Sequence, residues 1–352
     1  MSSVFNHPWL GGLFDDAEAA AIWAPERQLS HMLMFEAAFT RALGAVGTIS
    51  SDVAQTTASM IEQFDTDMTD LHHGTARDGL PVPALVAQLR QAAGENAKAV
   101  HTGSTSQDVM DTALALSIRE FNPILSERLN QLSGTLADLS QRFGENQIMG
   151  RTRMQAALSI TVADRLSTWA QPLDLHHTRL DQLRPRVECL QLGGAVGDRA
   201  ALTPNADAMA ADMAARLGLT NPGKAWHAMR DGIVEYANLL SLITGTLGKM
   251  GQDISLMATQ GIDEIALSGG GGSSAMPHKQ NPILAELLVT LARYNAMQVA
   301  GMHHALVHEH ERSGAAWALE WMILPDMARA AARSLSAAAQ LCQQITHIGQ
   351  GR

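Results

Sequence analysis

A glycine-rich segment at residues 268–282 carries the side chains with the clearest chemical potential. Its sequence is SGGGGSSAMPHKQNP, so four glycines precede the hydroxyl groups of Ser273 and Ser274 and the ammonium group of Lys279. The glycines disfavour helix and strand, and two prolines restrict the chain beyond them. This composition suits a lid that closes over an anionic substrate, and a plain surface linker would have a similar one. The phosphate-binding pattern G-x-x-x-x-G-K-[ST] is not matched.

Two earlier segments and one later group also place polar side chains together. The first segments are HTGSTSQDVMDTA at 101–113 and GRTRMQ at 150–155. From the residues alone, Ser106 would cap a helix and His101 would be an ordinary hydrogen-bonded residue. The later group, His304, His308 and Glu311, has a spacing that a metal ion accepts, but it does not match H-E-x-x-H. We therefore expect no metal site.

The order of residues at 272–282, GSSAMPHKQNP, resembles the signature G-S-S-x-M-P-x-K-x-N-P of the fumarase/aspartase superfamily at every fixed position. The resemblance implies that Ser273 is the base that forms a carbanion, and that Lys279 and Asn281 bind a substrate carboxylate. It also places Ser274 and Met276 in the substrate-binding loop. A serine can act as a base only where cations or backbone donors stabilise its alkoxide.

The two earlier segments resemble the other shared regions of this superfamily, in the same order. The segment at 101–113 resembles the first region. This implies that His101 approaches the substrate and that Thr105, Ser106 and Gln107 bind it. The segment at 150–155 resembles the second region, usually G-R-T-H-x-Q, so Gln155 also belongs to the expected site.

The second region departs from the common pattern at Arg153, where fumarases and adenylosuccinate lyases have a histidine that assists the leaving group. A cycloisomerase has no leaving group, and the bacterial carboxymuconate cycloisomerases lack this histidine. Arg153 is interpreted as a bidentate carboxylate ligand, with a solvent-exposed arginine as the alternative. Three further segments resemble that branch, and the last implies that Arg312 binds a carboxylate: QLGGAVGDRAAL, AWHAMRD and HEHERSGAAWALEW.

The resemblance implies an enzyme of aromatic breakdown without metal or organic cofactor, which converts the tricarboxylate 3-carboxy-cis,cis-muconate into a carboxymuconolactone. It also implies a homotetramer whose active sites are shared between subunits. Two alternatives stay open: a lyase of the same superfamily that releases fumarate, and a non-enzymatic helical scaffold. The presence of Ser273, Lys279 and Asn281 argues against the scaffold.

Five long helical patterns must carry these segments. The third, from Ile233 for about 35 residues, has apolar side chains three or four apart, which predicts a helix roughly 50 Å long. Such a rod needs neighbours, so the patterns predict a helical bundle and an all-α fold. No strand alternation is long enough to predict a sheet. The other four patterns run from Ser106 past Leu139, over 158–183, over 283–311 and over 315–345.

The chain is predicted to form a small N-terminal helical domain, residues 1–104, and a bundle domain, residues 105–352. In the first, a helical pattern follows Asp15 and Asp16 to about Ala45, breaks interrupt 47–82, and a short helix lies near 84–93. The sequence ends shortly after its last bundle helix, so the C-terminal domain usual in the superfamily is expected to be absent.

Composition limits the partners. A net charge of −10 over 352 residues argues against a nucleic-acid partner. Two distant cysteines, Cys189 and Cys342, form neither a disulfide scaffold nor a zinc site. No basic-then-apolar leader and no run of 18 apolar residues is present, which predicts a cytoplasmic protein without membrane contact.

Overall fold

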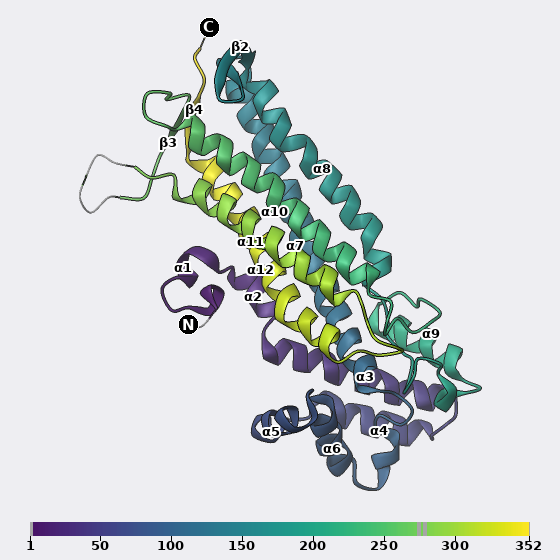
Figure 1. Cartoon of the computed structure of the whole chain (residues 1–352). Helices are drawn as coiled ribbons and strands as arrows, with labels where there is room; N and C mark the ends of the chain where they lie inside the picture. The colour runs from purple at the N-terminus through teal and green to yellow at the C-terminus, as the bar shows by residue number, and fades with distance from the viewer. Residues whose placement is uncertain (1–2, 273–275, 277–279, 352) are drawn as a thin grey trace.

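The computed structural model describes residues 3–272, 276 and 280–351 of the chain. Its dominant feature is an elongated bundle of long helices (Figure 1), which confirms the predicted all-α class. The helix predicted from Ile233 is shorter than expected, with 27 residues and a length of about 40 Å. The five long helices are α7 (Ser106–Phe143), α8 (Val162–Val187), α10 (Asp231–Met257), α11 (Ile283–Ala305) and α12 (Ala315–Gln344).

The centre of the bundle is built on the apolar stripe of α10. Tyr236, Leu240 and Ile243 are fully buried there, and burying each such side chain stabilises the fold by roughly 1.5–3 kcal/mol. Gly248 and Gly251 on α10 let α11 approach closely. A Cβ at Gly248 would lie 2.4 Å from the Cβ of Ala292, so a larger residue there would push the helices apart.

The N-terminal part contains more helix than the sequence predicted. The pattern expected to run unbroken to Ala45 is interrupted before Pro25, because proline at the first helical position starts a new helix. The stretch 47–82, predicted to be broken, contains two helices that begin after the capping side chains of Ser50 and Asp67. The helices of this part are α1 (Gly11–Phe14), α2 (Ala17–Ile22), α3 (Pro25–Ala45), α4 (Ser51–Glu62), α5 (Met68–Asp78) and α6 (Val82–Ala93).

Two apolar cores divide the described residues. One runs along the bundle. The other lies between the helices α3, α4, α5 and α6, the first turns of α7, and α9 (Ala206–Leu217). The second core therefore includes residues from beyond position 190, while the domain boundary after residue 104 stays a prediction. Short 3-10 turns lie at Val4–Asn6, Gly94–Ala99 and Ala200–Leu202.

The prediction that no sheet forms was wrong, because two small antiparallel pairs are present. β1 (Gln147–Thr152) pairs with β2 (Gln155–Thr161), and β3 (Ile265–Leu267) pairs with β4 (Ile345–Ile348). The helix predicted from residue 158 therefore begins only at Val162. Thr161 caps it by accepting a hydrogen bond from the backbone N–H of Asp164.

The bundle has two distinct ends (Figure 1). We call the one with helices α3, α4, α5, α6 and α9 and the start of α7 the α3 end, and the one with both strand pairs and residues 268–272 and 280–282 the hairpin end. Of the described helices, none combines the length and apolarity needed to cross a lipid bilayer.

Candidate active site

At the α3 end, the start of α7 brings together three predicted site residues. Thr105 is the N-cap and Ser106 the first residue of the helix. Arg312, in the linker 306–314 between α11 and α12, donates a hydrogen bond from Nη1 to Thr105 Oγ1. The N-terminus of a helix has free N–H groups and a partial positive charge. A guanidinium, two hydroxyls and these N–H groups together suit a carboxylate.

Asp108 fixes the start of α7, where Thr105, Ser106 and Arg312 lie. It is fully buried, and it accepts hydrogen bonds from the backbone N–H of Thr105, 3.0 Å away. The N–H groups of Gly193 and Gly194 also donate to it, at 2.8 and 2.9 Å. His227 Nε2 lies 2.8 Å from its Oδ1. One carboxylate thus joins three segments that are distant in sequence, which rigidifies the start of α7.

Gly194 shows how closely two of these segments approach. Its φ is +70°, a conformation that favours glycine. A Cβ at this position would lie 2.9 Å from the carbonyl oxygen of Gly103, in the segment that carries His101 and Thr105. The segment QLGGAVGDRAAL therefore supports the site through its backbone.

A fully buried ionic cluster of Asp111, Arg230 and Glu320 lies next to this site. Arg230 donates to Asp111 at 2.8 and 3.1 Å and to Glu320 at 2.9 and 2.5 Å. Burial alone would lower the pKa of Arg230, but these two carboxylates raise it above its ordinary value. Trp317 Nε1 and Gln107 Nε2 also donate to Asp111, at 3.0 and 3.1 Å. Gln107 therefore contacts the cluster through its amide nitrogen, and its role in substrate binding stays a prediction.

At the hairpin end, Arg153 and Gln155 lie at the turn between β1 and β2, and both are exposed. Arg153 has φ of 49° and, within the described part of the chain, forms no hydrogen bond or ion pair. Its neighbour Arg151 differs, because both carboxylate oxygens of Glu264 lie 2.7 Å from its Nη1. Of the two arginines in this hairpin, Arg153 is thus the one whose guanidinium can bind a partner outside the described residues.

Two described parts of the glycine-rich segment, residues 268–272 and 280–282, also lie at the hairpin end. Ser273, Ser274 and Lys279 lie outside the described residues. The side chain of Met276 is 43% exposed. Asn281 exchanges two backbone hydrogen bonds of 3.0 Å with Gly271, which forms the base of the loop.

A single chain does not bring together the predicted residues that the structure describes at its two ends. The 38 residues of α7 run from Thr105 towards β1, a length of about 57 Å. Figure 1 shows the start of α7 at one end of the bundle, and the hairpin and the loop base at the other. His101, Thr105, Ser106 and Arg312 therefore form one group, and the residues of the hairpin end form another.

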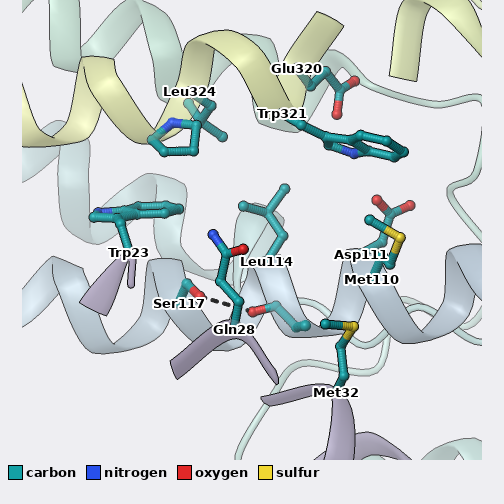
Figure 2. A pocket seen from close by; sticks show the side chains of 12 residues that line it. Trp23, Gln28, Met32, Met110, Asp111, Leu114, Ser117, Glu320, Trp321 and Leu324 are labelled. Atoms are coloured by element: carbon teal, nitrogen blue, oxygen red, sulfur yellow. Dashed lines mark hydrogen bonds between the residues drawn. The ribbon is translucent and has the colours of Figure 1, made fainter. Parts of the chain in front are cut away.

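One pocket lies outside both groups. It has a volume of about 210 Å³ and lies between α3, α7 and α12, with Trp23, Met32 and Trp321 among its walls (Figure 2). Asp111 and Glu320 line it, but both already bind Arg230.

The metal alternative gains no support from the described residues. Among them, no three His, Cys, Asp or Glu side chains gather at separations suited to a metal ion. The side chain of His308 is instead fully buried, with Nε2 3.6 Å from Glu320.

Sequence reasoning missed Asp108, Asp111 and Glu36 as supports of the site. Asp108 and Asp111 are one turn apart inside a segment that was singled out, so two carboxylates on one helix face were a usable signal. Glu36 contacts His101 from 65 positions away, and nothing in the local sequence indicates that contact.

Comparison with known proteins agrees with this architecture. The sequence profile of the lyase family matches residues 17–301. The 3-carboxy-cis,cis-muconate cycloisomerase of Pseudomonas aeruginosa is 36% identical over 98% of this chain and 77% of its own length. A solved 3-carboxy-cis,cis-muconate lactonizing enzyme from Pseudomonas putida superposes with a TM-score of 0.90, at 32% identity, over 97% of this chain and 77% of that one. A fumarate lyase from a Mesorhizobium species gives 0.88, at 31% identity, over 96% and 76%. The chain therefore belongs to the lyase family of the fumarase/aspartase superfamily and is similar to the 3-carboxy-cis,cis-muconate cycloisomerases within it.

Proposed function

We propose that this protein is a cycloisomerase that closes 3-carboxy-cis,cis-muconate to a carboxymuconolactone. The observation that carries the proposal is the similarity to a cycloisomerase over 98% of the chain, at 36% identity. Arg153 supports the same conclusion, because it stands where lyases of the superfamily have the histidine that assists a leaving group. Ring closure within one molecule releases no group.

The reaction makes one carbon–oxygen bond and one carbon–hydrogen bond. An oxygen of one carboxylate adds to a carbon of the conjugated diene, and the carbon next to another carboxylate takes up a proton. The substrate trianion thus gains one proton and becomes a lactone dianion, since one carboxylate turns into the ring ester. Between the two bond-forming steps, negative charge accumulates on the carboxylate next to the reacting carbon. Fixed positive groups at that carboxylate lower the barrier.

The α3 end supplies part of that positive charge. Arg312 together with Thr105, Ser106 and the first N–H groups of α7 would bind one carboxylate. His101 lies four residues before Thr105 and would meet the same substrate. With a net charge of −10, the protein needs such a local cluster to hold a trianion.

The hairpin end would supply the rest. Lys279 and Asn281 would bind a second carboxylate, and Ser274 and Met276 would lie beside them. Ser273 would be the base that removes the proton from carbon in the ring-opening direction and returns that proton in the lactone-forming direction. Arg153 and Gln155 would contact a third carboxylate from the exposed turn between β1 and β2. Arg153 suits this role because, among the described residues, no acidic side chain pairs with it.

A complete site then requires several copies of the chain, and we propose a homotetramer with shared sites. The length of α7 separates the two groups by about 57 Å within one copy. Four long helices also expose large apolar side chains that a neighbour would cover: Leu175 at 55%, Leu242 at 50%, Met297 at 68% and Met322 at 76%. Closed symmetric association covers such faces and can bring opposite ends together.

An ultraviolet assay tests the proposed function. The conjugated diene of 3-carboxy-cis,cis-muconate absorbs, and lactonisation removes that absorbance, so wild type is expected to bleach the substrate and to form a carboxymuconolactone identified by NMR. Superfamily lyase activity is assayed in parallel with adenylosuccinate and argininosuccinate. Release of fumarate from either compound, without turnover of carboxymuconate, would replace this proposal by the lyase alternative that the Mesorhizobium fumarate lyase represents.

A further inference from the structure

A buried carboxylate lies directly behind the histidine of the candidate site. Glu36, on α3, is fully buried, and its Oε1 lies 2.6 Å from Nδ1 of His101. The side chain of His101 is 13% exposed, so the ring separates Glu36 from the surface. The two residues are 65 positions apart, and the contact joins the N-terminal helices to the segment that starts α7.

Over the residues that the structure describes, the buried carboxylate of Glu36 has few polar partners besides His101. Among the described residues, His101 is its hydrogen-bond partner through Oε1, and the buried Oε2 has none. A buried carboxylate without a partner is costly, so the contact with the imidazole is the main compensation for burying this charge. Ser104 Oγ lies 3.1 Å from the same ring nitrogen and adds a second polar group there.

The backbone of His101 has a positive φ angle. The angle is +59°, a left-handed conformation that is uncommon for a residue other than glycine. In this conformation Nδ1 faces Glu36 on α3. Within the described part of the chain, no hydrogen bond engages Nε2, the other ring nitrogen.

We infer that Glu36 is a positioning residue that fixes Nδ1 of His101 as a protonated nitrogen and so presents Nε2 to the substrate. A carboxylate hydrogen-bonded to one nitrogen of an imidazole sets both the tautomer and the orientation of the ring. The inference rests on the proposed function, in which His101 meets the substrate beside Thr105 and Arg312. Glu36 itself does not contact substrate.

A double-mutant cycle on kcat/KM tests this role. Glu36→Gln keeps the size of the side chain but removes its charge, and it should lower kcat/KM for carboxymuconate by about 10- to 100-fold. In a His101→Ala background the same change should alter kcat/KM by less than about twofold, because the residue through which Glu36 acts is gone. Equal fold-losses in both backgrounds would overturn the inference.

Thr40→Val provides the matched control. Thr40 is buried one turn further along α3 and donates to the carbonyl oxygen of Ala99, so it supports the same segment without touching His101. Its substitution should change kcat/KM by the same factor with and without His101. Coupling as strong as that of Glu36 would mean that any loosening of α3 disturbs His101, and the specific role of Glu36 would be wrong.

A thermal-melting cycle separates failure of this inference from failure of the proposed function. His101→Ala leaves the Glu36 carboxylate buried without its partner, so it should lower Tm, and Glu36→Gln added to it should raise Tm again. Inactive wild type on carboxymuconate would contradict the proposed function, while the melting cycle would still support or contradict the pair. Additive melting effects would overturn the inference for any substrate.

Discussion

The two ends of the bundle differ in how their candidate site residues are held. At the α3 end, Thr105 bonds to Arg312, and Asp108 bonds to the backbone of Thr105, Gly193 and Gly194. At the hairpin end, Arg153 is exposed and makes no hydrogen bond to any described residue. The α3 end is held in place by hydrogen bonds within its own chain. The hairpin end presents the guanidinium of Arg153 without a partner among the described residues and therefore suits a surface that a neighbouring copy completes.

The difference has an energetic side as well. Asp111, Arg230 and Glu320 are each about 1% exposed, and removing Arg230 would leave two buried carboxylates without their cation. Side chains on the exposed turn between β1 and β2 contribute little to folding, because solvent screens their charges. Substitutions at the α3 end should therefore change stability and activity together, whereas those at the hairpin end should change activity alone.

The largest expected effect on activity comes from Lys279→Ala. Loss of the ammonium group that stabilises the developing carboxylate charge should lower kcat/KM by about 10²–10³-fold. The melting temperature should stay that of wild type, because a glycine-rich segment between β3 and α11 is not expected to form core contacts. Turnover and Tm are measured on the same preparation. A parallel loss of both would identify Lys279 as a structural residue.

Arg230→Ala should produce the largest effect on stability. It leaves Asp111 and Glu320 buried without their cation, which should lower the free energy of unfolding by about 3–5 kcal/mol. Arg186→Ala is the control, because Arg186 and its partner Glu235 are each 50% exposed and their pair should contribute less than about 1 kcal/mol. Urea unfolding compares the two variants. Similar losses would show that the buried cluster does not brace the α3 end.

A smaller effect is expected from Arg153→Lys. A point charge replaces the bidentate guanidinium, so KM should rise roughly tenfold, the equivalent of one charge-assisted hydrogen bond, with kcat and Tm nearly unchanged. Arg151→Lys is the matched comparison, because Arg151 is already paired with Glu264. Arg153→His should not create lyase activity, since the rest of the site is unchanged. Unaltered kinetics in Arg153→Ala would remove this residue from the site.

Periodicity in the sequence predicted the long helices well, because the apolar stripe of each is continuous over many turns. It failed at the ends of elements. The start of α8 was placed at residue 158, although Thr161 and Asp164 form a capping pair that is visible in the sequence. The strands of the hairpin were missed, since six or seven residues around a turn give too short a pattern.

The candidate site was predictable in part, through motifs. These identified His101, Thr105, Ser106 and Arg312, which lie together at the α3 end. Asp108 and Asp111, which support them, lie in the same segment, whereas Glu36 comes from a helix 65 positions away in sequence, and no local pattern encodes that contact. The distance between the start of α7 and the turn between β1 and β2 was predictable, because the helical pattern from Ser106 past Leu139 already implies a helix of about 50 Å between those two segments.

Complementation between inactive variants tests the shared site most directly. Ser106→Ala damages the α3 end and Ser273→Ala the hairpin end. If each site combines the two ends of different copies, random exchange of subunits should restore about one quarter of the sites. Mixing Ser106→Ala with Thr105→Ala is the control, since both damage the same segment and no intact site can form. Recovery of carboxymuconate turnover in the first mixture and not in the second is the predicted result. No recovery despite exchange shown by mass spectrometry, or a monomeric mass in light scattering, would contradict the shared site.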